Sequence, residues 1–326
     1  MKKSLISLAV VAGLAASGVA NAAPTAYGFI DVSLNSISDN TNTGATGGNE
    51  DNMNLSSNTS AIGLKGSEDL GDGVKAIYKV EFQVDVTDRV SGGSTTDRDQ
   101  FVGLKGGMGK VIFGTASSNY KQMGGKIDPF YRTAIQARSV GQQSPLHAGA
   151  GLDGGRMDKM VQYTSPNFGG ISVVLNTTFQ GNDDEASGIG VRYKTKGLDV
   201  WVDALSGVAD GSGALGGSFD SATKVGAKFK ATKEITVGGQ YETVDFVGGG
   251  DTTVLFLSGT FAMDKNNTIA LTYGATEDTT AGFSAGIWHK MSKMTSVYAA
   301  FNSMSEDTAG SGNDGSIIVA GIRKKF

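Results

Sequence analysis

Cysteine is absent from this chain of 326 residues, and histidine and proline are rare, with two and four residues respectively. The absence of Cys excludes a small fold held by disulfide bonds and any thiolate site for zinc or an iron–sulfur cluster. Two His leave little for metal chemistry, so we expect neither a metal site nor a cofactor. Long apolar runs are also missing after the first 22 residues. If the mature chain crosses a membrane, it must therefore do so with strands.

Glycine and proline are distributed as a many-stranded protein requires. The chain has 49 Gly but only 4 Pro, a ratio that suits strands joined by turns rather than a Pro-rich disordered chain. All four prolines, Pro24, Pro129, Pro145 and Pro166, fall outside the strands that we expect. Because Pro has no amide hydrogen for a ladder bond, this placement favours a sheet without spare edges.

The first residues have the organisation of a secretory signal. Lys2 and Lys3 form a charged start, residues 5–16 form a short apolar run, and Ala20-Asn21-Ala22 offers a small-residue cleavage site. The alternative, a membrane anchor, is disfavoured because the run is far shorter than the ~20 apolar residues of a spanning helix. We expect a signal peptide over 1–22 and one mature domain over 23–326.

The mature chain is acidic. Removal of Lys2 and Lys3 from the 28 basic residues leaves 26 against 32 acidic ones, a net charge of 26 − 32 = −6. Nucleic acid is therefore not an expected partner.

Alternation of apolar and polar residues recurs along the whole chain. In the last stretch, Ile318 and Ile322 share one face, whereas Arg323 lies on the other. We expect strands near residues 27–35, 60–66, 74–84, 98–106, 110–117, 159–165, 171–180, 189–194, 198–205, 224–231, 234–246, 252–263, 268–273, 283–290, 295–302 and 315–326. That is about sixteen, an even number as bacterial outer-membrane barrels have. The connections alternate between tight turns and long loops, which a soluble all-β protein, the alternative fold, does not explain.

A bilayer accounts for this pattern. Unpaired backbone groups in hydrocarbon cost several kcal/mol each, which only helices and closed sheets avoid. The sequence therefore predicts an all-β fold, a transmembrane antiparallel β-barrel whose wide interior is wet unless a segment folds inward. The candidate segment is the long third loop, residues 119–158, which carries charges of both signs, among them Asp128 and Arg132. The alternative is a mobile exterior loop.

Several motifs resemble the Gram-negative general porin family, in its neisserial and beta-proteobacterial form. They span the mature chain, and the second and last of them are the most specific: Tyr27-Gly28-Phe29-Ile30-Asp31, Gly63-Leu64-Lys65-Gly66-Ser67-Glu68-Asp69-Leu70-Gly71, Phe101-Val102-Gly103-Leu104-Lys105-Gly106, Tyr163-Thr164-Ser165-Pro166-Asn167-Phe168-Gly169-Gly170 and Gly321-Ile322-Arg323-Lys324-Lys325-Phe326. The family commonly has an arginine just before the Gly-Leu-Lys-Gly run, where this chain has Ala61-Ile62. Strong anion selectivity is therefore not assured.

The resemblance implies a passive channel for small hydrophilic solutes and ions in the outer membrane of a Gram-negative bacterium. It implies a homotrimer of sixteen-stranded barrels, each constricted by an inward-folded third loop, in contact with lipid and lipopolysaccharide. The aromatic end, Phe326, would be recognised by the barrel-assembly machinery. By position, the resemblance places Lys79, Glu81, Arg98, Asp128, Arg132 and Arg156 at the constriction. We expect Asp128 to face Lys79, Arg98 and Arg156.

Strand parity adds further residues to the wet wall. The inward parity contains Asp31, Lys75, Arg192, Lys228 and Arg323. Rings of charge set ion preference by changing the local ion concentration. The simpler reading of each residue is that it keeps the lumen hydrated.

Two other functions remain open from the sequence. A substrate-specific channel would use an aromatic track, for which Tyr120, Phe130 and Tyr131 are candidates. An outer-membrane hydrolase would need a nucleophile beside a base. His147 and His289 are the two histidines, and neither lies in a recognisable catalytic motif, so we expect no catalytic residue.

Overall fold

The computed structural model describes residues 23–38, 52–88, 95–147, 155–179, 181, 185–207, 219–277, 280–306 and 315–326. The expected signal peptide, 1–22, lies outside these residues. Within them, no helix is long and apolar enough to span a membrane.

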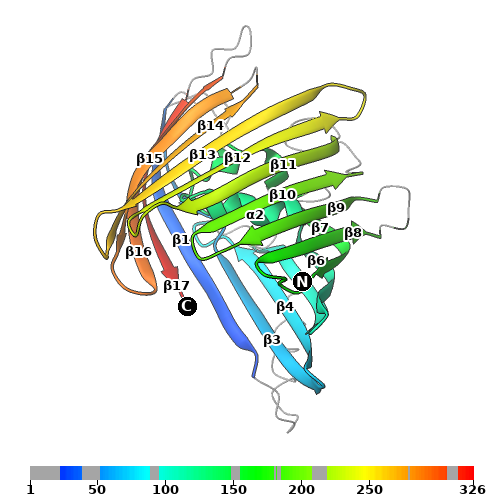
Figure 1. Ribbon diagram of the computed structural model, residues 1–326. Helices are drawn as coiled ribbons and strands as arrows, with labels where there is room; N and C mark the ends of the chain where they lie inside the picture. Colours follow the sequence, from blue (N-terminus) through cyan, green and yellow to red (C-terminus); the bar gives the residue numbers. More distant parts are fainter. Residues whose placement is uncertain are drawn as a thin grey trace.

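Seventeen strand elements form one antiparallel sheet (Figure 1). They are β1 (Thr25–Ser38), β2 (Asn52–Ser57), β3 (Ala61–Gly71), β4 (Val74–Val84), β5 (Thr95–Gly106), β6 (Gly109–Ser117), β7 (Arg156–Thr164), β8 (Ile171–Thr178), β9 (Ser187–Lys194), β10 (Leu198–Ser206), β11 (Phe219–Lys230), β12 (Ile235–Phe246), β13 (Asp251–Ala262), β14 (Asn267–Thr276), β15 (Thr280–Lys290), β16 (Thr295–Glu306) and β17 (Gly315–Lys325). Between β6 and β7 lie α2 (Asn119–Ile127) and two single turns of 3₁₀ helix, η2 (Ala137–Ser139) and η3 (Pro145–His147).

The elements amount to sixteen barrel strands, because β2 and β3 pair with successive halves of β1. The break between them falls at Asn58-Thr59-Ser60, where Thr59 has a φ of 50°. Asn58 donates to the carboxylate of Asp31 (2.8 Å), and the Ser60 hydroxyl accepts from the Asp31 amide (3.0 Å). The Ser60 side chain thus takes the place of a backbone partner at the break, and the Asn58 side chain holds the Asp31 carboxylate.

The sheet closes on itself between its two ends. β1 pairs with β17 over ten residue pairs, from Phe29 with Lys325 to Ser38 with Ser316. The backbone of Phe326 then exchanges two hydrogen bonds with Gly28, each 3.1 Å long. Closure removes both sheet edges, so every strand has two partners and the predicted antiparallel barrel is confirmed.

The two faces of the barrel differ as a bilayer requires. Alternate residues expose large apolar side chains, for example Leu34 (47%), Val102 (58%) and Leu271 (54%). The intervening residues are buried and often polar, such as Asp31, Gln240 and Glu242. An apolar surface of this extent on the outside fits contact with lipid, and the buried polar face is the inner one.

The segment 118–147 touches this inner face at widely separated strands. Asn119 in α2 bonds to Asp203 of β10, Gln142 bonds to Thr272 of β14, and the carbonyl of Arg132 accepts from Arg323 of β17. A segment can reach the inward faces of β10, β14 and β17 at once only by crossing the interior of a closed ring. Figure 1 shows α2 between the walls of the barrel.

Candidate functional site

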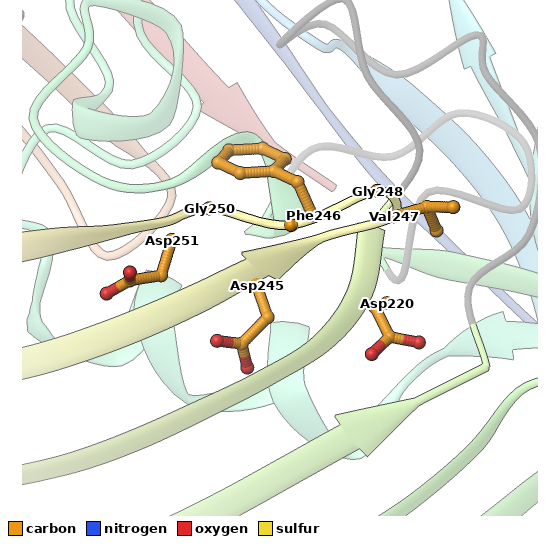
Figure 2. A pocket seen from close by; sticks show the side chains of 8 residues that line it. Asp220, Asp245, Phe246, Val247, Gly248, Gly250 and Asp251 are labelled. Atoms are coloured by element: carbon orange, nitrogen blue, oxygen red, sulfur yellow. The ribbon is translucent and has the colours of Figure 1, made fainter.

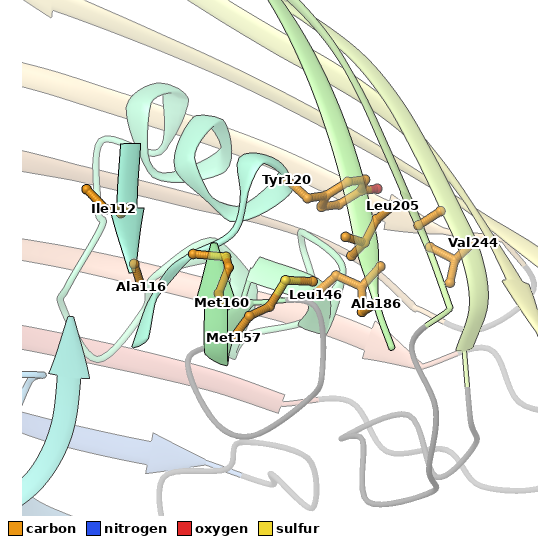
Figure 3. Packing of buried hydrophobic residues seen from close by; sticks show 10 residues of the cluster. Ile112, Ala116, Tyr120, Leu146, Met157, Met160, Ala186, Leu205 and Val244 are labelled. Atoms are coloured by element: carbon orange, nitrogen blue, oxygen red, sulfur yellow. The ribbon is translucent and has the colours of Figure 1, made fainter. Parts of the chain in front are cut away.

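Apolar packing attaches the segment 118–147 to the inner wall. Tyr120 and Leu146, both fully buried, pack with Leu205 of β10 and Val244 of β12 in a cluster that also includes Met157 and Met160 of β7 (Figure 3). A second cluster seats Phe130 and Ile135 against β1, β14, β16 and β17, and a third seats Met123, Ile127 and Ala137 against Trp201 and Phe256. Each fully buried side chain of this size stabilises the docked segment by roughly 1.5–3 kcal/mol.

Glycines let the segment pack tightly against itself. A Cβ atom on Gly124 would lie 2.2 Å from the ring of His147, and one on Gly125 would lie 2.7 Å from the ring of Tyr131. Helix α2 begins after Ser118, whose hydroxyl accepts from the amide of Lys121 (3.1 Å). The pair of glycines weakens a short helix but permits both rings to stack on it.

Paired charges lie on the wall formed by β4, β5 and β7. The Arg98 Nε donates to Glu81 (2.6 Å), and Lys79 bridges Glu81 (3.1 Å) and Asp99 (2.9 Å). Arg156 Nε completes the row with a 2.9 Å bond to Asp99. The structure therefore brings together four of the residues predicted from the sequence, Lys79, Glu81, Arg98 and Arg156. Their role in permeation stays a prediction.

Asp99 joins this row although strict alternation assigns it and Arg98 to opposite faces. Val80 pairs with Gln100 and Phe82 pairs with Asp97, so Arg98 and Asp99 together oppose the single residue Glu81. Such a bulge turns two consecutive side chains toward the same partner. Asp99 was therefore not among the residues predicted from the sequence, since no local signal marks the bulge.

A hollow of about 420 Å³ separates this wall from the segment 118–147. On the wall side it is lined by Lys79, Asp99, Phe101, Lys110, Ile112, Ala116, Ser117 and Gln162, and on the segment side by Lys121, Gln122, Gly125, Lys126 and Tyr131. Four lysines and one carboxylate thus face it. Burial lowers the pKa of Lys121 well below its usual value, and the nearby cations Arg138 and Arg156 add to this shift. An anion in the hollow would relieve this crowding of positive charge.

The structure places Asp128 differently from the expectation. Its carboxylate accepts the backbone amides of Phe130 (2.8 Å) and Ala137 (2.9 Å), within the segment itself. Burial raises the pKa of Asp128 to about 6. It therefore shapes a turn within the segment, whereas Lys79, Arg98 and Arg156 pair with Glu81 and Asp99. Of the charges that line the hollow, the wall contributes Lys79, Lys110 and Asp99, and the segment contributes Lys121 and Lys126.

Arg132 does lie near the wall, in a strained position. Its φ is 65°, a left-handed conformation that is unfavourable for a residue with a side chain. The guanidinium of Arg323 holds this turn by donating to the carbonyls of Tyr131 (3.0 Å) and Arg132 (2.7 Å). The Arg132 guanidinium lies 4.0 Å from Glu81 and stacks 4.7 Å from the centre of the Phe29 ring.

The other predicted wall residues are divided between structural pairs and open positions. Arg323 binds Asp31 (2.6 Å), and Arg192 binds Asp203 (2.7 Å), both against fully buried carboxylates. Lys228 is half-buried and donates to the carbonyl of Lys126 (2.7 Å). Lys75 lies 3.8 Å from Asp69 near the turn that joins β3 and β4. Three of the five, Arg192, Lys228 and Arg323, donate to backbone carbonyls of the segment and so join it to the barrel.

The residues proposed for the two rival functions are mostly inaccessible. Tyr120 and Phe130 are fully buried, so only Tyr131 of the expected aromatic track lines the hollow. His147 is also buried, and the neighbouring Ser144 hydroxyl donates to Glu242 (2.6 Å) rather than to the imidazole. His289 lies near the end of β15, beside Asn267 (2.8 Å). These positions offer no nucleophile paired with an accessible base.

A separate hollow of about 500 Å³ lies at the ends of β11, β12 and β13 (Figure 2). Asp220, Asp245 and Asp251 surround it beside a turn of three glycines, Gly248–Gly250. Asp245 is already bonded to Ser221 (2.6 Å). Within the described parts of the chain, no group of three or more His, Asp or Glu could hold a metal ion. This hollow is remote from the wall of paired charges.

A closed sixteen-stranded barrel with an apolar exterior and charged inner walls defines a transmembrane channel of the porin class. Comparison with known proteins specifies it further: the sequence profile of the Gram-negative porin family matches residues 7–309, so the chain belongs to that family. It therefore resides in the outer membrane of a Gram-negative bacterium.

Individual relatives agree with the family assignment. An outer membrane porin protein of Bordetella pertussis is 27% identical over 307 residues, covering 80% of this chain and 78% of the relative. Outer membrane porin protein 32 of Delftia acidovorans is 32% identical over 247 residues, covering 74% of this chain and 66% of the relative. The solved anion-selective porin of Comamonas acidovorans superposes with a TM-score of 0.79 at 21% identity, over 93% of this chain and 99% of that one.

Proposed function

We propose that this porin is a passive diffusion channel for small hydrophilic solutes, narrowed by the segment 118–147, and that it favours anions. Water that is continuous through the lumen spares a solute the dehydration cost of crossing hydrocarbon. Transport then follows concentration gradients, with no cofactor and no enzymatic turnover. The proposal is supported by the family and by the wet, charged inner wall.

The lining of the 420 Å³ hollow carries the anion preference. Lys79, Lys110, Lys121 and Lys126 face it with Asp99 as the only carboxylate among its lining residues. Adding the adjacent Arg98, Arg132, Arg156 and Glu81 gives seven cations and two carboxylates. A surplus of one sign raises the local concentration of ions of the other sign. The relative from Comamonas acidovorans is titled as anion-selective, which agrees with this sign.

The reversal potential across a salt gradient in a planar bilayer tests the proposal. We expect potassium chloride to give the sign of chloride preference, with conductance that rises with salt and no saturation by a particular sugar. A cation-selective sign would refute the charge argument. Saturable block by one solute would favour a substrate-specific channel instead.

We also propose a homotrimer. A solved outer-membrane protein of Vibrio cholerae of this fold is described in a trimer form. The mass of the detergent-solubilised protein, measured by light scattering, distinguishes one, two or three chains. Lipid and lipopolysaccharide around the apolar exterior, and recognition of Phe326 by the barrel-assembly machinery, complete the expected partners.

A further inference from the structure

A buried lysine on the wall opposite the hollow binds both ends of the segment 118–147. The ammonium of Lys224, on β11, donates to the carbonyl of Tyr120 in the first turn of α2 and to Nε2 of His147 (2.8 Å) in η3. It also lies 4.1 Å from the centre of the Tyr120 ring. Tyr120 and His147 are 27 residues apart, so one side chain joins the beginning and the end of the segment to a single point on the wall.

The lysine is sealed from solvent by the segment that it holds. Its side chain has 0% exposure, as does that of Asp203, whose carboxylate lies 3.9 Å away. Tyr120 and His147 have 0% and 1% exposure. A buried ammonium is tolerated only with charge and hydrogen-bond partners, so detachment of either end exposes a group that the docked segment satisfies.

Geometry requires a neutral His147. Its Nε2 accepts from Lys224, and its Nδ1 lies 3.1 Å from the carbonyl of Ser144, to which only an N–H can donate. One nitrogen must therefore carry the proton and the other a lone pair. A second proton would place a hydrogen on Nε2 directly against the Lys224 ammonium.

The charged groups around His147 come from every element packed on it. Lys224 faces it from β11, Lys121 from α2 and Arg138 from η2, whereas Glu242 on β12 lies 3.7 Å from Nδ1. The carboxylate of Glu242 is occupied by Tyr120 (2.8 Å), Ser144 (2.6 Å) and Gln240 (2.6 Å). Burial and the three cations thus outweigh one carboxylate, and they lower the pKa of His147 well below its usual value.

We propose that Lys224 is a positioning residue for permeation, which fixes the segment 118–147 through Tyr120 and His147, and that protonation of His147 releases it. The proposal rests on the proposed function, in which this segment narrows the channel. Once the segment leaves the wall, His147 regains water and an ordinary pKa near 6.5. Below that pH the released arrangement binds a proton that the docked one does not.

The direction follows from this difference in proton binding. Through His147 alone, the docked arrangement is favoured above pH ~6.5, and its population relative to the released one falls by about tenfold for each pH unit below that, until the lowered pKa of the docked ring is reached. Asp128 acts oppositely, because its raised pKa favours the docked turn in acid. The test therefore compares variants of His147 in which Asp128 is unchanged.

Thiol labelling measures release directly, since the native chain has no Cys. The reporter is Ala137→Cys, at a position of 1% exposure in the segment, and an exposed Ser292→Cys supplies the labelling rate for normalisation at each pH. Both are reconstituted as full chains in liposomes and treated with a maleimide between pH 7.5 and pH 5. We expect the normalised labelling of Ala137→Cys to rise by about threefold as the pH falls from 7.5 and to level off below about pH 6, where protonation of Asp128 in the docked segment offsets that of His147 in the released one, with larger conductance fluctuations in planar bilayers.

Two substitutions identify the titrating group. His147→Gln keeps a neutral acceptor for Lys224 and should abolish the rise, whereas His289→Gln, which removes the only other histidine, should preserve it. No rise in the parent protein, the same rise in His147→Gln, or loss of the rise in His289→Gln would each overturn the proposal. Because ion selectivity at pH 7.5 is recorded on the same preparations, failure here is separable from failure of the anion-channel proposal.

A further pair of variants tests whether Lys224 positions the segment. Lys224→Met should give fast labelling at every pH, while Lys230→Met, on the same face of the same strand, should behave as the parent protein. Heat-modifiable electrophoretic mobility confirms that each barrel has assembled. An assembled Lys224→Met barrel that keeps slow labelling at pH 7.5 would contradict the positioning role.

Discussion

Two walls of this barrel each carry a lysine–aspartate pair, and the two pairs have different roles. On β4 and β5, Lys79 and Asp99 are 2.9 Å apart with side-chain exposures of 21% and 19%. On β10 and β11, Asp203 and Lys224 are 3.9 Å apart, and both have 0% exposure. The first pair borders the hollow and can act on passing ions. The second is covered by the segment 118–147 and acts on that segment instead.

The two pairs differ in exposure because the segment 118–147 covers one of them, not because their residue types differ. Water screens the charges that border the hollow only in part, so they act on mobile ions over several ångströms. Charges beneath the segment have no mobile ions to attract, and their energy appears as hydrogen bonds to Tyr120, Ser144 and His147. Substitutions that border the hollow should therefore change ion selectivity, whereas those beneath the segment should change the free energy of unfolding.

The largest effect is expected beneath the segment. Glu242→Ala removes the acceptor for Tyr120, Ser144 and Gln240, leaving buried donors unpaired. We expect the free energy of unfolding to fall by about 3 kcal/mol, measured by urea titration in detergent micelles. Glu277→Ala, which removes an exposed carboxylate bonded to Thr253, should cost roughly 0.5 kcal/mol or less. An equal fall in the free energy of unfolding in the two variants would mean that burial beneath the segment does not strengthen the contacts of Glu242.

On the open wall, Asp99→Asn should change selectivity more than stability. It frees Lys79 and Arg156 from their shared carboxylate, and one charge at such distances is worth about 1 kcal/mol for a passing ion. We expect the chloride-to-potassium permeability ratio from reversal potentials to rise roughly fivefold. Asp97→Asn makes the same change in charge outside the hollow lining and should leave the ratio unaltered; a matching rise there would locate the selectivity elsewhere.

A smaller effect is expected for Lys110→Gln. Lys110 lines the hollow but is one of four lysines, so its loss should lower the permeability ratio by about twofold. Lys290→Gln, at the exposed end of β15, serves as the control. The same bilayer recordings measure both, and a ratio that does not fall in Lys110→Gln would remove this residue from the conducting path.

The smallest effect separates two lysines on one face of β11. Lys228 donates to the carbonyl of Lys126, as Lys224 does to that of Tyr120, but Lys228 is only half-buried and its hydrogen bond is open to solvent. Water can replace its hydrogen bond, so Lys228→Met should lower the free energy of unfolding by about 0.5 kcal/mol. Urea titration beside Lys224→Met gives the comparison. A loss as large as that of Lys224→Met would show that exposure is a poor guide to these contacts.

The barrel itself could be predicted because its determinants are periodic. Fifteen of the expected strands correspond to one strand element each, and the range 60–66 overlaps the first half of β3 (Ala61–Gly71). The short element β2 (Asn52–Ser57) was expected to be loop, since its residues are mostly polar. Lys79 and Glu81, two residues apart on β4, share one face of the strand and lie 3.1 Å from each other, while their place in the constriction stays a prediction.

Prediction failed where register or long-range packing decides the outcome. Asp99 was missed because the bulge opposite Glu81 is a property of the pairing of β4 with β5, not of either strand alone. Asp128 was expected to face the wall, but its amide partners, Phe130 and Ala137, become available only in the folded segment. No local pattern distinguishes Lys224 and Glu242 from inward residues that meet the lumen, and they are buried because the segment covers them.

The sequence by itself determined a closed, lipid-facing barrel, because alternation with a period of two places apolar side chains outside and polar ones inside on every strand. The tertiary structure alone decided which inward charges meet the lumen and which are buried. That choice depends on where a segment from between β6 and β7 settles on strands more than a hundred residues later, as Gln142 does on Thr272. No local pattern encodes such contacts, since their energy comes from surfaces that only the closed barrel brings together.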